Sequence, residues 1–296
     1  STTMRIPTSD GTVWFKASGP GTAHEGRLLE IFRTRGIRQV LLPLAVHPER
    51  PWLLFEDGGP TLRATRADGT GDHDLLAWQR ILTEYAALQR SLESATAVEV
   101  MLAAGVPDGR PERLAAELER LLEDDTVWAR VSSEEVVPAA AARRRLAGSR
   151  GAAREAARRL ASAGVAATVQ HDDLHGGNIF TGPTGDRIFD WGDASVAHPF
   201  ATLTATFNSI ADKTGLALDD PAFSRLRDTY TDAWTDVLPQ NALAELTELA
   251  RDFGCLGEAL AWERALIGLE PAEMDGLGDS VAGWLIEFAD RFNGRA

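Results

Sequence analysis

Residues 168–180 read TVQHDDLHGGNIF, and residues 188–193 read IFDWGD. Their apolar positions predict three short strands, separated by a polar loop at 171–178 and a turn at 181–186, with an acidic turn at 190–193. Asp173 and Asn178 stand five residues apart across a Gly-Gly bend, so both can face one point. Asp190 ends the third strand, and we expect it beside Asn178.

The residue types in this segment indicate a hard metal ion next to an acid–base group. An Asp and an Asn that converge without a cysteine or a histidine pair suit Mg²⁺, which prefers oxygen ligands. A second Asp close by, not needed for the metal, can accept or orient a hydroxyl proton.

Upstream of this segment, the chain predicts a small strand-rich part. Residues 12–17 predict a strand carrying Lys16, one of only two lysines in a chain with 28 arginines. Residues 23–35 predict a helix, because their apolar side chains recur at helical spacing. We expect further strands at 40–46 and 52–56. The run DGGP that follows is the best candidate for a hinge.

The rest of the chain predicts mostly helices. Amphipathic stripes and a proline suited to a first helical turn predict them at 75–92, from Pro111 onward, and at 139–163, 242–267 and 278–293. The sequence therefore indicates an α+β fold with two domains. We expect a strand-rich N-terminal lobe at 1–57 and a large helical C-terminal lobe at 58–296.

Composition excludes several classes of protein. Apolar residues make up 44% of the chain and charged residues 25%, which is typical of a soluble globular protein. No apolar run approaches the roughly 20 residues of a membrane span, and no signal-peptide core is evident. Cys255 is the single cysteine, so an internal disulfide or a Cys-rich zinc site is excluded. We expect a cytoplasmic protein with no membrane partner.

The negative charge is concentrated in the C-terminal third. The chain has a net charge of −14, from 30 basic and 44 acidic residues, which argues against nucleic acid as a partner. Residues 190–296 hold seven basic and 19 acidic side chains, a net charge of −12. This region is either a solvated acidic surface or a field that attracts a cationic ligand.

The pattern His171-x-Asp173-x-x-x-x-Asn178, followed by Asp190-Trp191-Gly192, resembles the catalytic and metal loops of a known family. It is the aminoglycoside phosphotransferase and choline kinase-like family of small-molecule kinases, in the protein-kinase-like superfamily. The resemblance spans about residues 12–200. It implies a bilobal kinase-like fold and transfer of the γ-phosphate of ATP, with Mg²⁺, to a hydroxyl of a small molecule.

The resemblance also implies roles for individual residues. Asp173 would face the acceptor hydroxyl as the catalytic carboxylate, while Asn178 and Asp190 would hold Mg²⁺. Lys16 would contact the α- and β-phosphates, and Glu25 would hold Lys16 in place.

The remaining candidates follow from the resemblance and from the acidic C-terminal part. The backbone of residues 54–58, which include Phe55 and Asp57, would contact the adenine. Glu30, on the same predicted helix as Glu25, is an alternative partner for Lys16. Further candidates for contact with the acceptor or for bracing the loops are His171, His175, Asp193, Glu258 and Glu263. The acidic residues favour an amine-bearing acceptor, such as an aminoglycoside or an amino sugar.

The chain departs from the family pattern in two places. Asp172 stands where the family usually has glycine. About fifteen residues precede Lys16, room for one strand, and no Gly-rich loop is evident there, so we expect a shortened, apparently truncated strand-rich lobe.

Three alternatives remain at the level of sequence. The chain could be a catalytically silent kinase-like binding protein, or a kinase for a neutral sugar or amino alcohol. A metal-dependent hydrolase that uses His171, Asp173 and His175 is the third.

Overall fold

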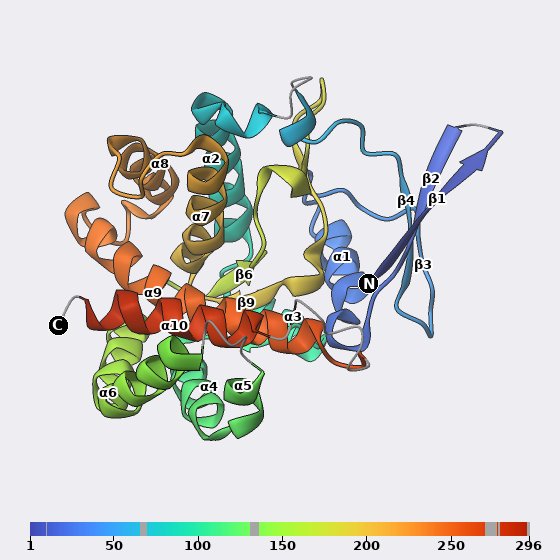
Figure 1. Cartoon of the computed structure of the whole chain (residues 1–296). Helices are drawn as coiled ribbons and strands as arrows, with labels where there is room; N and C mark the ends of the chain where they lie inside the picture. Colours follow the sequence, from blue (N-terminus) through green and yellow to red (C-terminus); the bar gives the residue numbers. More distant parts are fainter. Residues whose placement is uncertain (10, 66–69, 131–135, 270–276, 278, 295–296) are drawn as a thin grey trace.

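The computed structural model describes residues 1–9, 11–65, 70–130, 136–269, 277 and 279–294. A small strand-rich part and a large helical part lie side by side (Figure 1).

The N-terminal residues form an antiparallel sheet with the strand order β1-β2-β4-β3. The elements of this part are β1 (Thr2–Thr8), β2 (Gly11–Ala17), α1 (Glu25–Thr34), β3 (Ala45–Val46) and β4 (Trp52–Glu56). Helix α1 packs closely on the sheet at Gly26, where an added Cβ would lie 3.0 Å from the Val46 side chain. β1 is the exposed outer edge, and Pro7 within it has no N–H to donate to a further strand.

The strand expected at 40–46 is wrong over most of its length. Only β3 pairs with β4. The N–H of Leu41 donates to the carbonyl of Ile188 (3.0 Å), and the N–H of Ile188 donates to the carbonyl of Gln39 (2.8 Å). This segment therefore joins the helical part, and Pro43 cannot donate to a strand ladder.

The helical part follows β4, and five of its helices were expected from the sequence. They are α2 (Leu75–Ser91), α4 (Pro111–Glu123), α6 (Val136–Ser162), α9 (Gln240–Ala265) and α10 (Ser280–Asn293). The last was expected to begin at Gly278, which lies outside the described residues. Asp74 caps α2 by accepting from the N–H groups of Leu76 (3.1 Å) and Ala77 (3.0 Å). The helices α3 (Ala95–Ala103), α5 (Asp125–Ala129), α7 (Leu203–Thr214) and α8 (Pro221–Thr231) were not predicted.

Short strands at the centre carry the loops that the sequence singled out. They are β5 (Asp108–Gly109), β6 (Thr168–Gln170), β7 (Ile179–Phe180), β8 (Arg187–Ile188) and β9 (Ser195–Ala197). β9 lies between β5 and β6, and β7 pairs with β8 in a hairpin. The loop at 171–178 connects β6 to β7, and the turn at 190–193 follows β8, so both loops start from buried backbone.

The hydrophobic core is continuous between the two parts. Trp191, fully buried in the turn after β8, contacts Phe32 of α1 with ring centroids 4.7 Å apart. This contact fixes α1 against the loops of the helical part. Among the described residues, no helix is both long enough and apolar enough to cross a membrane.

Candidate functional site

The Lys16 ammonium group joins the strand-rich part to the loops of the helical part. Lys16 lies on β2, and its Nζ is 2.6 Å from a carboxylate oxygen of Glu25 and 2.6 Å from Oδ1 of Asp190. Burial works to lower the pKa of Lys16, but the two carboxylates outweigh it and hold that pKa above its ordinary value. Lys16 is therefore charged at neutral pH.

Glu25, and not Glu30, contacts Lys16. Glu25 is the first residue of α1 and is 1% exposed. Its carboxylate also accepts from the Ser18 hydroxyl (2.9 Å) and from the N–H of Trp191 (3.1 Å). Glu30, farther along the helix, pairs with Arg33 at 3.3 Å. The network around Glu25 fixes the position of the lysine.

Asp190 adopts a left-handed backbone conformation, with φ 64°. Such a conformation is uncommon for a residue with a side chain and marks a geometry imposed by its surroundings. Burial alone would raise the pKa of Asp190, but the Lys16 ammonium group outweighs this and holds it below its ordinary value. Asp190 is therefore ionised at neutral pH.

Asp173 and Asn178 converge as the loop spacing suggested. The Asn178 amide Nδ2 donates to Asp173 Oδ2 (2.9 Å) and to the Asp173 carbonyl (3.0 Å). The Asp173 side chain is 44% exposed, so its carboxylate is held by the loop and still accessible. The N–H of Phe189 donates to the carbonyl of Asn178 (3.0 Å), which brings the segment before Asp190 alongside.

The two histidines brace this loop. His171 is fully buried; its Nδ1 accepts from the N–H of Asp173 (3.3 Å), and its Nε2 donates to the carbonyl of Phe189 (2.8 Å). Burial lowers the pKa of His171, so the ring is neutral. His175 Nδ1 accepts from the N–H of Gly177 (2.9 Å), and its Nε2 lies 3.5 Å from Asp173.

This arrangement argues against the zinc hydrolase. Both ring nitrogens of His171 are engaged with the backbone, so neither is available to a metal ion. Within the part of the chain that the structure describes, no group of three or more His, Cys, Asp or Glu side chains is placed to hold a metal ion. Oxygen donors do fit Mg²⁺. The Nδ2 of Asn178 is turned toward Asp173, so its amide Oδ1 can face a metal ion, and Lys16 contacts Oδ1 of Asp190, which leaves Oδ2 for the metal.

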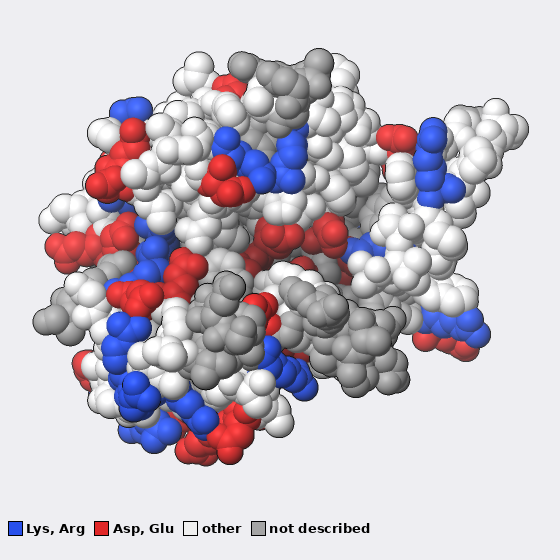
Figure 2. All heavy atoms as spheres, in the orientation of Figure 1, with Lys and Arg blue, Asp and Glu red and all other residues white. Residues whose placement is uncertain are grey.

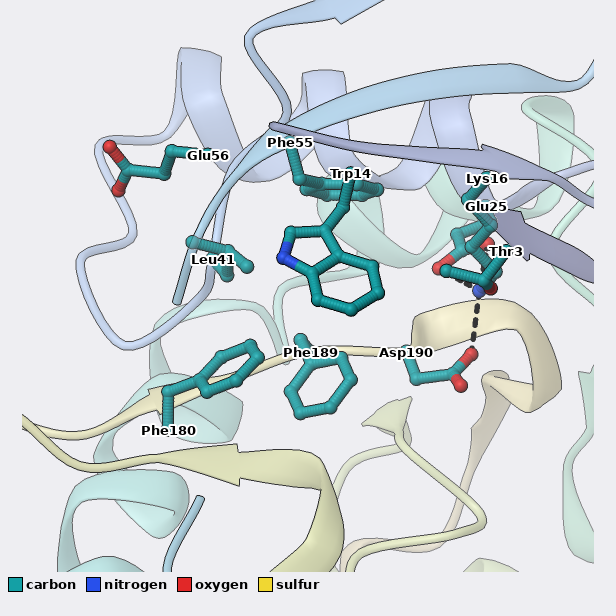
Figure 3. A pocket seen from close by; sticks show the side chains of 10 residues that line it. All are labelled: Thr3, Trp14, Lys16, Glu25, Leu41, Phe55, Glu56, Phe180, Phe189 and Asp190. Atoms are coloured by element: carbon teal, nitrogen blue, oxygen red, sulfur yellow. Dashed lines mark hydrogen bonds and ion pairs between the residues drawn. The ribbon is translucent and has the colours of Figure 1, made fainter. Parts of the chain in front are cut away.

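An aromatic cavity of about 280 Å³ opens beside Lys16 and Asp190. Figure 3 shows Trp14 facing Phe180 and Phe189 across it. Phe180 and Phe189 stack with centroids 4.2 Å apart. Trp14 stands two residues before Lys16 on β2, and alternation along a strand places both on one face. The cavity therefore offers flat apolar surfaces next to a buried positive charge.

The segment expected to contact adenine lines one side of this cavity. Phe55 and Glu56 line the cavity, whereas Asp57 does not. Asp57 accepts from the N–H of Gly59 (3.0 Å) and from Trp14 Nε1 (3.4 Å). Gly58 has no room for a side chain, since an added Cβ would lie 2.3 Å from the Phe180 ring.

A second cavity, of about 220 Å³, is lined by Asp173 and other acidic residues. Figure 2 shows acidic side chains gathered in the hollow at the middle of this face. The lining residues are Asp172, Asp173, Asp193, Glu258, Ala261, Trp262 and Ala265. The four lining residues from α9 recur at the three- and four-residue spacing of a single helix face.

Asp172 and Glu258 of this cavity are buried, and Asp193 is half-buried. Burial raises the pKa of Asp172 to about 6, and burial with the charges of Asp173 and Asp190 raises the pKa of Asp193 to about 6. Glu258 is 9% exposed, and burial raises its pKa well above the ordinary value. Glu263 does not line the cavity; it pairs with Arg120 of α4 at 2.5 Å.

Asp172 also has a left-handed backbone, with φ 59°. This explains why a family of this type favours glycine there, since glycine adopts positive φ without strain. In this chain the Asp172 carboxylate accepts from the Ser195 hydroxyl of β9, which holds the residue in place.

Several residues of the site were not predicted from the sequence. They are Trp14, Phe180, Phe189 and Arg264. The position of Trp14, two residues from Lys16 on one strand, is a signal that could have found it. Arg264 lies about 70 residues beyond the loops, and no local pattern marks it.

Comparisons with known proteins agree with this geometry. The family model described as the phosphotransferase enzyme family matches residues 16–249. No curated protein sequence matches significantly.

Solved structures of small-molecule kinases share the fold. The chain is 12% identical to an ethanolamine kinase from Plasmodium vivax, with a TM-score of 0.59, over 95% of this chain and 78% of that one. It is 16% identical to an aminoglycoside 2′-phosphotransferase solved with GDP, with a TM-score of 0.57, over 99% and 93%. It is 16% identical to a choline kinase from Streptococcus pneumoniae, with a TM-score of 0.52, over 96% of this chain and 89% of that one.

The expected kinase-like α+β fold is therefore confirmed. The matched region begins at Lys16 and includes the loops that hold Asp173, Asn178 and Asp190. On this match, which covers most of its length, the chain belongs to the phosphotransferase enzyme family.

Proposed function

We propose that the protein transfers the γ-phosphate of ATP, with Mg²⁺, to a hydroxyl group of a small cationic molecule. The observation that carries this proposal is the position of Asp173, Asn178, Asp190 and Lys16 between an aromatic and an acidic cavity. The reaction would take place in the cytoplasm, where ATP is available. In this proposal the boundary between the two lobes lies between residues 57 and 58.

The aromatic cavity is suited to the nucleotide. The base would stack on the aromatic rings, with Trp14 on one side and Phe189 on the other, and the backbone near Phe55 would contact its edge. Lys16, at the inner end, would contact the α- and β-phosphates. The family includes enzymes that bind nucleotide, as the GDP complex of the aminoglycoside 2′-phosphotransferase illustrates.

Asn178 and Asp190 would hold Mg²⁺ through their free oxygens. When bound, the ion neutralises charge on the phosphates. The remaining work falls to the protein, because phosphoryl transfer depends mainly on positioning and charge stabilisation.

Asp173 would orient the acceptor. Its Oδ2 is held by Asn178, so the carboxylate can receive the acceptor hydroxyl and take its proton. A bond then forms between the acceptor oxygen and the γ-phosphorus, while the bond from that phosphorus to the β-phosphate oxygen breaks. ADP leaves, and the proton is released from Asp173.

The acidic cavity favours a cationic acceptor, such as an aminoglycoside or an amino sugar. It places Asp193 and Glu258 beside Asp173, and Trp262 adds an aromatic face. A positive charge is attracted to such a cavity by both the carboxylates and the ring.

The test is transfer of labelled γ-phosphate from ATP to a panel of acceptors. The panel pairs amine-bearing sugars and amino alcohols with neutral sugars of similar size. We expect Mg²⁺-dependent labelling of an amine-bearing member, and labelling slower by about 10²–10⁴-fold with Asp173→Asn. Equal labelling of neutral partners would contradict the cationic assignment, and no transfer despite ATP binding would favour a silent binding protein.

A further inference from the structure

Three cavities lie in a row at the site. Lys16 and Asp190 line both the aromatic cavity and a middle cavity of about 140 Å³. Asp193 and Ala265 line both the middle cavity and the acidic cavity. With a nucleotide in the first cavity and an acceptor in the third, as proposed above, the γ-phosphate would lie at the middle cavity, which shares lining residues with both.

Arg264 of α9 lines this middle cavity. Its Nη2 donates to the carbonyl of Asp193 (3.0 Å), and its Nε is buried without a hydrogen-bond partner. No carboxylate of the described residues lies within 4.0 Å of the Arg264 guanidinium, although several surround it at longer range. The Arg264 side chain is half-buried, and a half-buried guanidinium group without a direct ion-pair partner is suited to bind an anionic ligand.

The place of Arg264 is fixed relative to the lysine. Residues 20–22 form a short turn between β2, which carries Lys16, and α1. This turn packs on the backbone of α9, since a Cβ added to Gly21 would lie 2.0 Å from the Arg264 carbonyl oxygen. A movement of α9 would therefore push on the turn that follows Lys16.

Arg264 is one of two basic side chains that line the middle cavity. Among the described side chains that line the three cavities, only those of Lys16 and Arg264 are basic. Lys16 is already shared between two carboxylates. Arg264 is thus the basic side chain of this cavity that has no direct ion-pair partner among the described residues. A guanidinium group can bind a phosphate through two parallel hydrogen bonds.

We propose that Arg264 binds the γ-phosphate of ATP and keeps this contact as the group moves to the acceptor. This assignment rests on the proposed function. Arg264 stays protonated throughout, and the proton of the acceptor hydroxyl goes to Asp173 as described above. No further reactant is needed.

The test compares the affinities of adenosine, ADP and a non-hydrolysable ATP analogue, each with Mg²⁺, for the wild type and Arg264→Gln. We expect the variant to bind the ATP analogue about tenfold or more weakly, with adenosine affinity unchanged, because only the γ-phosphate contact is lost. Arg264→Lys should recover part of the loss. It also keeps the test usable if Arg264→Gln does not fold.

Arg251→Gln is the matched control. Arg251 is another arginine of α9 whose Nε has no hydrogen-bond partner, and it lies over the Phe207 ring and lines none of the three cavities. This variant should lose stability but keep the preference for the ATP analogue over ADP. Equal weakening of all three ligands by Arg264→Gln, or an unchanged preference, would overturn the assignment. A wild type that binds no nucleotide would instead refute the proposed function, and this assignment with it.

Discussion

The Nζ of Lys16 lies 2.6 Å from Oδ1 of Asp190, a residue 174 positions later in the chain. Glu25 completes this buried cluster, so one ammonium group links β2, α1 and the turn after β8. The same three side chains thus hold the two parts together and line the aromatic cavity. Different substitutions in this cluster should therefore separate its contribution to stability from its contribution to activity.

Lys16→Met should lower the free energy of unfolding by about 3–5 kcal/mol, because it leaves the Glu25 carboxylate buried without its partner. The double variant Lys16→Met/Glu25→Gln should recover most of this loss, since the uncompensated charge is removed. Denaturant unfolding measures both. Both variants should lack phosphotransfer activity, because both lack the Lys16 ammonium group. A double variant that is active would contradict the proposed role of Lys16.

Asp173→Asn should lower the transfer rate by about 10²–10⁴-fold, because the amide cannot take the hydroxyl proton. The affinity for ATP should change little, since Asp173 lies on the acceptor side. Steady-state kinetics with nucleotide titrations separate these effects. Asp212→Asn, at an exposed carboxylate of α7, is the control and should behave as the wild type. A normal rate in Asp173→Asn would remove this residue from the mechanism.

Asp172→Gly should gain stability relative to the wild type as the pH rises. The pKa of Asp172 is about 6 in the folded protein, against an ordinary value of 3.8. Its stabilising contribution is therefore present at low pH and is lost as the pH rises through 6. The glycine variant lacks the carboxyl group, so its stability relative to the wild type should rise by about 2 kcal/mol between pH 4 and pH 7. If the stabilities of the wild type and of Asp172→Gly change in parallel over this pH range, the pKa of Asp172 is not raised in the folded protein.

Trp14→Ala should weaken ATP binding by about 1–3 kcal/mol, the typical contribution of stacking a base on an aromatic side chain. Phe15→Ala is the matched control, because Phe15 is the next residue of β2, faces the other side of the sheet and contacts Trp52. Calorimetry with adenosine and with ATP should show equal losses for Trp14→Ala. A larger effect from Phe15→Ala would place the base elsewhere.

The elements around the loops could be predicted because each carries a local signal. The loop at 171–178 and the turn at 190–193 combine polar residues with adjacent apolar strands. The helices α2, α4 and α10 carry clear apolar stripes. The strand at 40–46 was wrong because Leu41 pairs with Ile188, a contact that depends on the tertiary fold.

The parts of the candidate site that the sequence left open depend on contacts between distant segments. Arg264 and Glu258 reach the site because α9 packs beside the loops, and nothing in residues 258–264 alone distinguishes Glu258 from Glu263. Helical geometry decides between them, since Glu258 faces the acidic cavity and Glu263 faces Arg120. Asp172 was noticed as a departure from the family, but its bond to Ser195 depends on the pairing of β6 with β9.

Calorimetric titration with ATP, with and without Mg²⁺, on the wild type and Asp190→Ala tests the central claim most directly. Our account predicts that the wild type binds ATP more tightly with Mg²⁺, and that Asp190→Ala loses this dependence while it still binds adenosine. Identical ATP affinity in the wild type with and without Mg²⁺, unchanged in Asp190→Ala, would contradict the account.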